Sequence, residues 1–262
     1  MITVDYFGRT GNNLFQYCVA RLVAMTNGCS LGTRWNDNAF IEAIEPLDRP
    51  EKVKDKIEIG DLPNIYAECL KNRYYDINLH GYYQNAEFYN RFRNRIKEFF
   101  RLTPVVKNTE DIVIHLRLTD YWWRPNSCVI SPMWYLAILK KQKFRKLYIV
   151  VEPHITNKKY LSYFSQFRNE VVSGTPKSDF EFLRSFDRIV CSNSTFAWWA
   201  AFLSDASKIW IFKRWMGLHR KDCLRLANVD WATVVDGEFI RNKHYEVMDW
   251  TDYWKKPEES YV

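Results

Sequence analysis

The sequence predicts an α/β protein built on open, mostly parallel sheets. From residue 111 onward, short apolar segments alternate with segments whose apolar residues recur at helical spacing. This alternation is typical of parallel strands joined by right-handed helical crossovers. The first 26 residues show a similar pattern once, as a strand, a glycine-containing loop and a helix. The 262 residues, 47% of them hydrophobic, can bury a large core and form either one large domain or two smaller α/β lobes.

The amino-terminal lobe is predicted only in part. Its elements are a strand at 2–7, a loop at 8–13, a helix at 14–26, a strand at 77–83 and an amphipathic helix at 87–100. Prolines punctuate residues 35–76, which give no clear assignment. Polar residues near Thr103 and Pro104 predict a lobe boundary, with domains at 1–105 and 106–262.

The carboxyl-terminal lobe is predicted more completely. Strands are expected at 112–116, 147–151, 171–172, 189–191 and 208–212, and helices at 132–141, 158–164, 179–186 and 195–204. The aromatic and charged tail at 249–262 is not assigned. Buried parallel strands of this kind predict an open sheet with helices on both faces.

Composition limits the classes of partner and site. The 38 basic and 31 acidic side chains give a net charge of +7, which favours anionic partners. The six cysteines form no Cys-x-x-Cys pair and no zinc-type spacing with histidine, so we expect reduced thiols and no structural zinc. With neither a signal-peptide pattern nor an apolar run of about 18 residues, we expect a soluble intracellular protein with no transmembrane segment.

One segment, residues 188–203, has the layout of an anion site. An apolar strand is followed by Ser192, Asn193, Ser194 and Thr195, and then by a helical apolar pattern. Ser194 or Thr195 can cap the helix, whose first N–H groups and positive dipole end favour a phosphate. A capped helix that only packs in the core would show the same pattern, and this segment alone does not decide between them.

Further motifs fall where ligands gather in open α/β sheets, at the carboxyl ends of strands. The loop at 8–13 has glycines that allow a ligand close to the backbone, although a tight turn needs the same residues. His115 and Arg117 lie two residues apart on one face of a buried strand. A buried guanidinium needs an anion, which can be a ligand, Asp120 or another carboxylate, and His115 can equally be a core histidine.

Four motifs together resemble the alpha-1,2-fucosyltransferase family, glycosyltransferase family 11. The protein O-fucosyltransferases and alpha-1,6-fucosyltransferases are more distantly similar. The motifs occur in family order as GRTGNNLFQY at 8–17, GYYQN at 81–85, HLRLTDY at 115–121 and SNSTFAWWAA at 192–201. The resemblance extends over about residues 1–215.

This resemblance implies a two-lobed GT-B type fold with short lobes. It also implies a nucleotide-sugar donor held by the second lobe, a glycan acceptor on the first, and inverting transfer without a metal or another cofactor. By position, Arg117 matches the arginine that contacts the donor diphosphate, and Ser194 and Thr195 match the phosphate-binding helix start. An arginine and helix N–H groups are also the donors that a departing diphosphate requires.

The remaining candidate residues surround these positions. For the donor they are Gly11 and Asn12 of the first loop, His115, Ser192, Asn193 and Asp179, the last placed where related enzymes hold the nucleotide base. For the acceptor they are Tyr82, Gln84, Trp122 and Trp123. Asp120 is the first candidate for the base that activates the acceptor hydroxyl, ahead of Glu152, Asp5 and His115.

Departures from the family pattern leave the donor sugar open. The family usually has a second arginine and a glycine where this chain has Leu118 and Thr119, and paired acids where it has residues 150–153. GDP-fucose is the donor that the resemblance implies, and a rhamnose donor is the alternative. The sequence is also compatible with a non-catalytic sugar-nucleotide binder and with a polyanion or nucleic-acid binding module, although the basic residues are scattered rather than striped.

Overall fold

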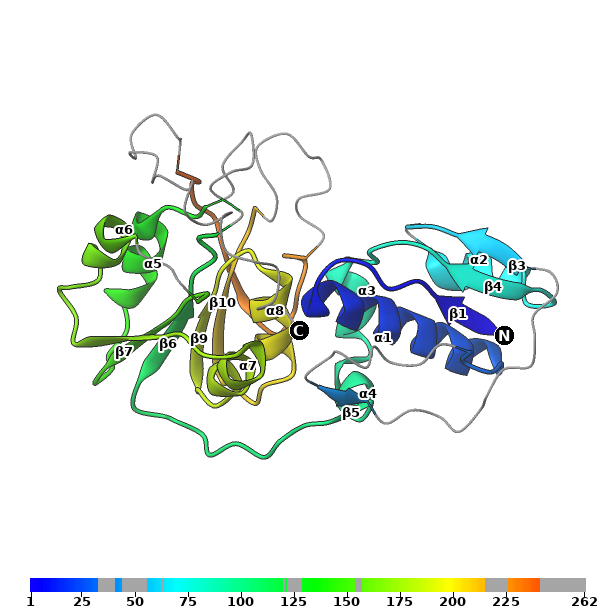
Figure 1. Cartoon of the computed structure of the whole chain (residues 1–262), viewed down its shortest axis with the longest axis horizontal. Coiled ribbons are helices and arrows are strands. Elements are labelled where there is room, and N and C mark those ends of the chain that lie inside the picture. Colours follow the sequence, from blue (N-terminus) through cyan, green and yellow to red (C-terminus); the bar gives the residue numbers. More distant parts are fainter. Residues whose placement is uncertain are drawn as a thin grey trace, which may run out of the picture.

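The structure is a computed structural model that describes residues 1–32, 41–43, 56–62, 64–119, 121, 129–153, 157–214 and 226–240. It contains two parallel sheets that lie at opposite ends of the long axis, with helices between and around them (Figure 1). The expected α/β fold with parallel sheets is confirmed.

The amino-terminal sheet has three parallel strands in the order β1-β4-β3. These strands are β1 (Ile2–Val4), β3 (Lys56–Ile59) and β4 (Asp76–Leu79), and the helices that accompany them are α1 (Thr10–Asn27), α2 (Ile65–Lys71), α3 (Ala86–Asn90) and α4 (Arg93–Lys97). A two-stranded antiparallel pair joins β2 (Glu42–Ala43) to β5 (Phe100–Arg101). The single helix predicted at 87–100 is therefore wrong, because the chain turns between α3 and α4 and ends in a strand.

The second sheet has six parallel strands in the order β11-β10-β9-β6-β7-β8. The strands are β6 (Ile112–His115), β7 (Leu147–Val150), β8 (Asn169–Val172), β9 (Arg188–Cys191), β10 (Lys208–Phe212) and β11 (Thr233–Val235). The helices are α5 (Pro132–Leu139), α6 (Lys158–Ser162), α7 (Pro176–Arg184) and α8 (Thr195–Phe202). Except for β11, each of these elements was predicted to within a few residues.

Both faces of this sheet are buried, each in its own core. Ile112 and Ile114 of β6 pack with α5 and α6, whereas Val113, between them, packs with α7 and α8. Successive side chains of a strand point to opposite faces, so a strand covered on both sides is apolar throughout. This explains why the apolar runs of the carboxyl-terminal half could be recognised in the sequence.

The core on the α8 side continues into the amino-terminal part of the chain. The Phe15 ring of α1 lies 5.0 Å from that of Trp198 and 4.8 Å from that of Trp199, both of α8. At the other end of α8, Arg93 donates through Nε to Phe202 O at 2.9 Å, and Lys97 donates to Ser204 O at 2.8 Å. Cations are favourable at the carboxyl end of a helix, so both ends of α8 are held by the amino-terminal half.

The two halves approach each other closely at Gly11. A Cβ atom on Gly11 would lie 2.5 Å from Thr195 Oγ1 and 2.8 Å from Phe196 N. The amino-terminal turns of α1 and α8 therefore touch, as Figure 1 shows near the centre of the molecule. Only glycine fits at this position.

We expect Gly11→Ala to lower the free energy of unfolding by about 1–3 kcal/mol, because the added methyl group forces α1 and α8 apart. Urea unfolding measures this difference. Gly60→Ala is the matched control, since a Cβ on Gly60 would meet its nearest neighbour, His80 O, at an ordinary 3.6 Å. Equal loss of stability in both variants would contradict the close approach.

Candidate active site

The six-stranded sheet places the candidate site at its topological switch point. The chain runs outward from β6 through β7 to β8, then returns to the other side of β6 with β9. In open α/β sheets, ligands bind outside the carboxyl ends of the strands at such a point. Arg117 lies just past the end of β6, and residues 192–195 follow β9 directly. The structure thus brings together the two motifs that the sequence separates by more than 70 residues.

Arg117 is held by a carboxylate from the neighbouring strand. Its guanidinium forms an ion pair with Glu152, and the two side chains are only 12% and 15% exposed. Glu152, just past β7, also accepts hydrogen bonds from Leu118 N at 3.0 Å and from Thr119 Oγ1 at 2.7 Å. The anion that the sequence requires for Arg117 is therefore supplied, at least in part, by the chain itself.

The Arg117 guanidinium also lies over an aromatic ring. Its central carbon is 5.5 Å from the centroid of Tyr121, a distance at which cation–π attraction operates. The Tyr121 hydroxyl donates to Asn193 O at 3.0 Å. Tyr121 thereby connects the segment after β6 to the segment after β9.

His115 is a buried, neutral histidine of the core. It is 3% exposed, and its Nδ1 lies 2.7 Å from Ser192 Oγ. Burial lowers the pKa of His115 to about 3, and the charge of Arg117 acts in the same direction. The imidazole contacts the Ser192 side chain and is shielded from solvent. Of the two interpretations left open, the structure favours the core histidine.

The start of α8 is assembled without a side-chain cap. Ser194 occupies the N-cap position, yet its side chain makes no capping hydrogen bond. The expected capping by Ser194 is therefore not found. Ser192, Asn193 and Ser194 are all at most 5% exposed. Thr195 is partly exposed and donates through Oγ1 to Asn12 Oδ1 at 3.3 Å. The amino end of α8 therefore contacts the first turn of α1.

The loop predicted at 8–13 is shorter in the structure, because α1 begins at Thr10 instead of at residue 14, and polar side chains fix this segment. Gly8 has a φ of +81°, which favours glycine. Asn12 Oδ1 also accepts from Gln84 Nε2 at 2.9 Å. Behind it, Gln16 accepts from Phe7 N at 3.2 Å and donates to Gly81 O at 3.2 Å. The segment at 8–13, which includes the first turn of α1, the loop at 80–85 and the start of α8 thus form one hydrogen-bonded unit.

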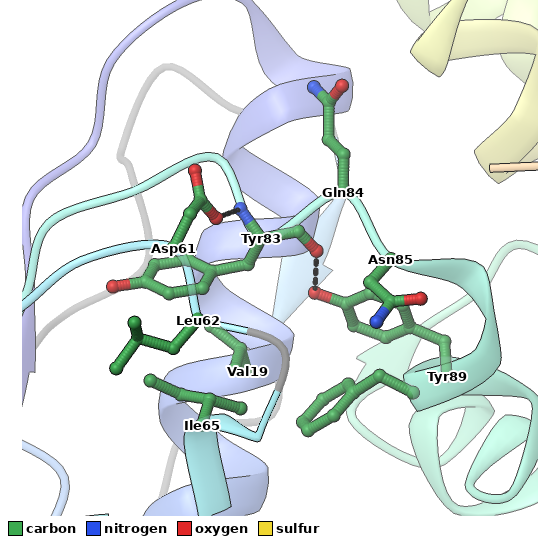
Figure 2. Close-up of a pocket in the computed structure, with 9 residues that line it drawn as sticks. Val19, Asp61, Leu62, Ile65, Tyr83, Gln84, Asn85 and Tyr89 are labelled. Atoms are coloured by element: carbon green, nitrogen blue, oxygen red, sulfur yellow. Dashed lines mark hydrogen bonds between the residues drawn. The ribbon is translucent and has the colours of Figure 1, made fainter. Parts of the chain in front are cut away.

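The loop at 80–85 carries the predicted acceptor residues Tyr82 and Gln84. Asp61 accepts from Tyr82 N at 2.9 Å and from Tyr83 N at 2.6 Å. These bonds, with the Tyr89 hydroxyl on Tyr83 O at 2.8 Å, hold Tyr83 at a φ of +52°. Figure 2 shows the Gln84 side chain pointing away from the small pocket beside Asp61. Positive φ in a non-glycine residue is strain that the surrounding bonds maintain.

The remaining predicted residues are more distant or outside the described part of the chain. Asp179 is buried on α7, where its carboxylate accepts from Gly174 N at 2.9 Å and burial raises its pKa. This bond fixes the loop after β8, and contact with a nucleotide base stays a prediction. Asp120, Trp122 and Trp123 lie outside the described residues.

One group in the described part of the chain brings three metal-type ligands together. Atoms of Asp5, Glu58 and His80 lie within 4.8 Å of one another, and all three residues are exposed. They sit at the carboxyl end of the amino-terminal sheet. In the same described part, no helix is long and apolar enough to cross a membrane, and the four described cysteines are free.

Several residues in and around the hydrogen-bonded unit of the first turn of α1, the loop at 80–85 and the start of α8 were not predicted as site residues from the sequence. His80 was placed inside a strand predicted at 77–83, whereas β4 ends at Leu79 and leaves His80 on the sheet edge. The glycine at position 81 was the available signal, because it marks a turn. Gln16 and Asp61 make contacts with residues far away in the chain, which a local pattern does not contain.

Comparisons with known proteins now decide the family. The profile of glycosyl transferase family 11 matches residues 56–216, well over half of the chain. The chain belongs to glycosyl transferase family 11. The expected enzyme class, a glycosyltransferase, and the resemblance to this family are confirmed. The matched range includes Arg117 and residues 192–195 and begins after the first glycine loop.

Two solved structures are similar to this member of family 11. A mutant of Arabidopsis thaliana FUT1 in complex with GDP has a TM-score of 0.53 at 12% identity, covering 80% of this chain and 70% of that one. The NodZ alpha-1,6-fucosyltransferase soaked with GDP-fucose has a TM-score of 0.45 at 12% identity, covering 79% and 93%. No curated protein matches the sequence. The first similarity shows a shared fold.

The low pKa of His115 predicts a pH dependence of stability. An unfolded histidine binds a proton near pH 6.5, whereas folded His115 resists one down to about pH 3. Stability therefore falls as pH decreases through this window, with a slope of up to about 1.4 kcal/mol per pH unit. His115→Gln should remove this slope contribution in urea unfolding at pH 4 to 7. Identical slopes in both proteins would contradict a neutral buried imidazole.

Proposed function

We propose that this glycosyltransferase moves a fucosyl group from GDP-fucose to a hydroxyl of a glycan acceptor, with inversion and without a metal. The observation that carries the proposal is the convergence of Arg117 and the amino end of α8 at the switch point. A guanidinium and helix N–H groups at one place are suited to a diphosphate. The GDP in the FUT1 structure supports a guanosine donor.

The proposed reaction is a single displacement. The acceptor oxygen attacks the anomeric carbon while the bond to the diphosphate breaks on the opposite face. Negative charge develops on the departing diphosphate, where Arg117 and the N–H groups of α8 stabilise it. Donors already in position need little reorganisation at the moment of reaction, so their contribution is made in the transition state.

Gly11 and Asn12 act at this site from the amino-terminal side. Asn12 contacts both Gln84 and Thr195, which supports a place for it between the proposed donor and acceptor sites. The loop at 80–85 provides the acceptor side with Tyr82, which is 45% exposed. The proposed division of roles is a donor site after β6 and β9 and an acceptor site after β1 and β4, with the boundary between the lobes at residue 105.

We expect Arg117→Ala to lower kcat/KM for transfer from GDP-fucose by about 10²–10³, because one charge-assisted contact to the leaving group is lost. Calorimetric titration with GDP should show weaker binding. Arg101→Ala is the matched control, since Arg101 forms an exposed pair with Glu42 on the β2–β5 ribbon, and it should match wild type. A folded Arg117→Ala protein with unchanged GDP affinity and turnover would refute the site.

The same titration, repeated with other nucleotides, tests the donor. GDP should bind more tightly than UDP or TDP and should raise the melting temperature most, because a ligand stabilises the state that it binds. GDP-fucose should be consumed in preference to GDP-rhamnose. Preference for another nucleotide sugar would reassign the donor, and binding of oligonucleotides with steep salt dependence would favour a nucleic-acid module.

Removing the charge of Glu152 is predicted to strengthen donor binding. The Glu152 carboxylate is paired with the guanidinium that would bind the diphosphate, so its negative charge opposes donor binding. Glu152→Gln keeps the shape and removes the charge. GDP should then bind about tenfold more tightly, equivalent to ~1.4 kcal/mol, although the free energy of unfolding should fall because Arg117 loses its ionic partner. Weaker GDP binding would show that the Glu152 charge is required to orient Arg117.

A further inference from the structure

We propose that His80, oriented by Asp5, is the base that activates the acceptor hydroxyl; this inference rests on the proposed function. Asp5 directly follows β1 and His80 directly follows β4, two neighbouring parallel strands. His80 Nδ1 lies 3.1 Å from Asp5 Oδ2. The pair stands at the carboxyl edge of the amino-terminal sheet, as Arg117 does in the second sheet.

A fixed series of hydrogen bonds orients the pair. Thr3 Oγ1 donates to Asn78 Oδ1 at 2.8 Å, so the Asn78 amide presents its nitrogen to Asp5 Oδ2 at 2.9 Å. Hydrogen bonds from Asn78 and His80 lower the pKa of Asp5, and an ionised carboxylate can only accept. His80 Nδ1 therefore carries the hydrogen, which leaves the lone pair of the neutral imidazole on Nε2.

The His80 imidazole is exposed to solvent and lies beside an aromatic ring. The His80 side chain is 60% exposed and that of Asp5 is 52% exposed. The Phe7 ring lies 5.3 Å from the imidazole, and the Tyr82 ring meets the Phe7 ring edge-on at 4.6 Å. Aromatic faces beside polar groups suit the apolar face of a sugar. Buried His115, in contrast, has no such access.

The pair is tied to the donor site through the loop at 80–85. Gln84 follows His80 by four residues, so their Cα atoms are at most ~14 Å apart. Gln84 contacts Asn12, which contacts Thr195 at the start of α8. Asp61 and Tyr89 fix the backbone between them at Tyr83. The loop that carries His80 is therefore bonded to the start of α8, where the proposed diphosphate site lies.

The proton and electron balance is simple. His80 Nε2 takes the proton of the acceptor hydroxyl as its oxygen bonds to the anomeric carbon. The electron pair of the breaking bond leaves with the GDP diphosphate. The imidazolium, stabilised by the Asp5 carboxylate, later gives its proton to water. Asp5 acts through His80 and is a positioning residue, whereas His80 is the catalytic residue.

The test uses GDP-fucose with water as acceptor, so that no glycan has to be identified. Release of GDP is followed for wild type, His80→Gln and Asp5→Asn. Asp205→Asn is the matched control, because the Asp205 side chain is exposed and, like Asp5, accepts from a neighbouring side chain, that of Lys97. We expect His80→Gln to slow hydrolysis about 100-fold or more, and Asp5→Asn to slow it less. GDP titration should show unchanged affinity in both.

Azide separates a base from a structural residue, because this anion attacks carbon without losing a proton. Azide should restore GDP release in His80→Gln and form fucosyl azide. The inference would be overturned if His80→Gln hydrolysed GDP-fucose at the wild-type rate, or if azide failed to restore GDP release in that variant. It would also be overturned if EDTA abolished wild-type activity and Mn²⁺ or Zn²⁺ restored it. Abolition of hydrolysis by Asp120→Asn with His80→Gln unaffected would assign the base to Asp120. Wild type that neither binds GDP nor consumes GDP-fucose would instead refute the proposed function.

Discussion

The contact between the amino-terminal turns of α1 and α8 is the constraint on which the rest of the structure depends. Because Gly11 has no side chain, Thr195 and Phe196 N can pack against it, whereas a Cβ atom at this position would collide with both. Around this point Phe15 packs on Trp198 and Trp199, and Asn12 joins Gln84 to Thr195. Two helix amino-termini, each the positive end of a helix dipole, therefore lie close together. The proposed donor diphosphate would relieve their mutual repulsion and would couple the packing of the two halves to donor binding.

A second constraint is the balance of charge between Arg117 and Glu152. Arg117 is mostly buried and would be costly without a partner, and Glu152 supplies that partner. The family pattern has a second arginine where this chain has Leu118, which is 1% exposed and contributes its backbone N–H to Glu152. Within the described residues of this segment, the Arg117 guanidinium therefore has an internal counter-ion. The proposed donor diphosphate would have to share the Arg117 guanidinium with that carboxylate or displace it.

The sequence was informative where structure is set locally and where burial is complete. Strands such as β6 and β9 are covered on both faces, so their apolar runs were recognisable, and the polar residues that follow them marked Arg117 and the start of α8. The amino-terminal sheet was harder, because β3 has exposed Lys56 and Glu58 and depends on pairing with β4. Contacts between distant residues, such as Glu152 with Arg117 and His80 with Asp5, follow from topology, which no local pattern contains.

The central claim is that a donor diphosphate lies between Arg117 and the amino end of α8, against the first loop. A crystal structure of the protein with GDP tests it most directly. The diphosphate should lie within hydrogen-bond distance of the Arg117 guanidinium and of backbone N–H groups at residues 194–196, with Gly11 and Asn12 beside it. GDP bound at any other edge of either sheet, with the Arg117–Glu152 pair undisturbed, would contradict the claim.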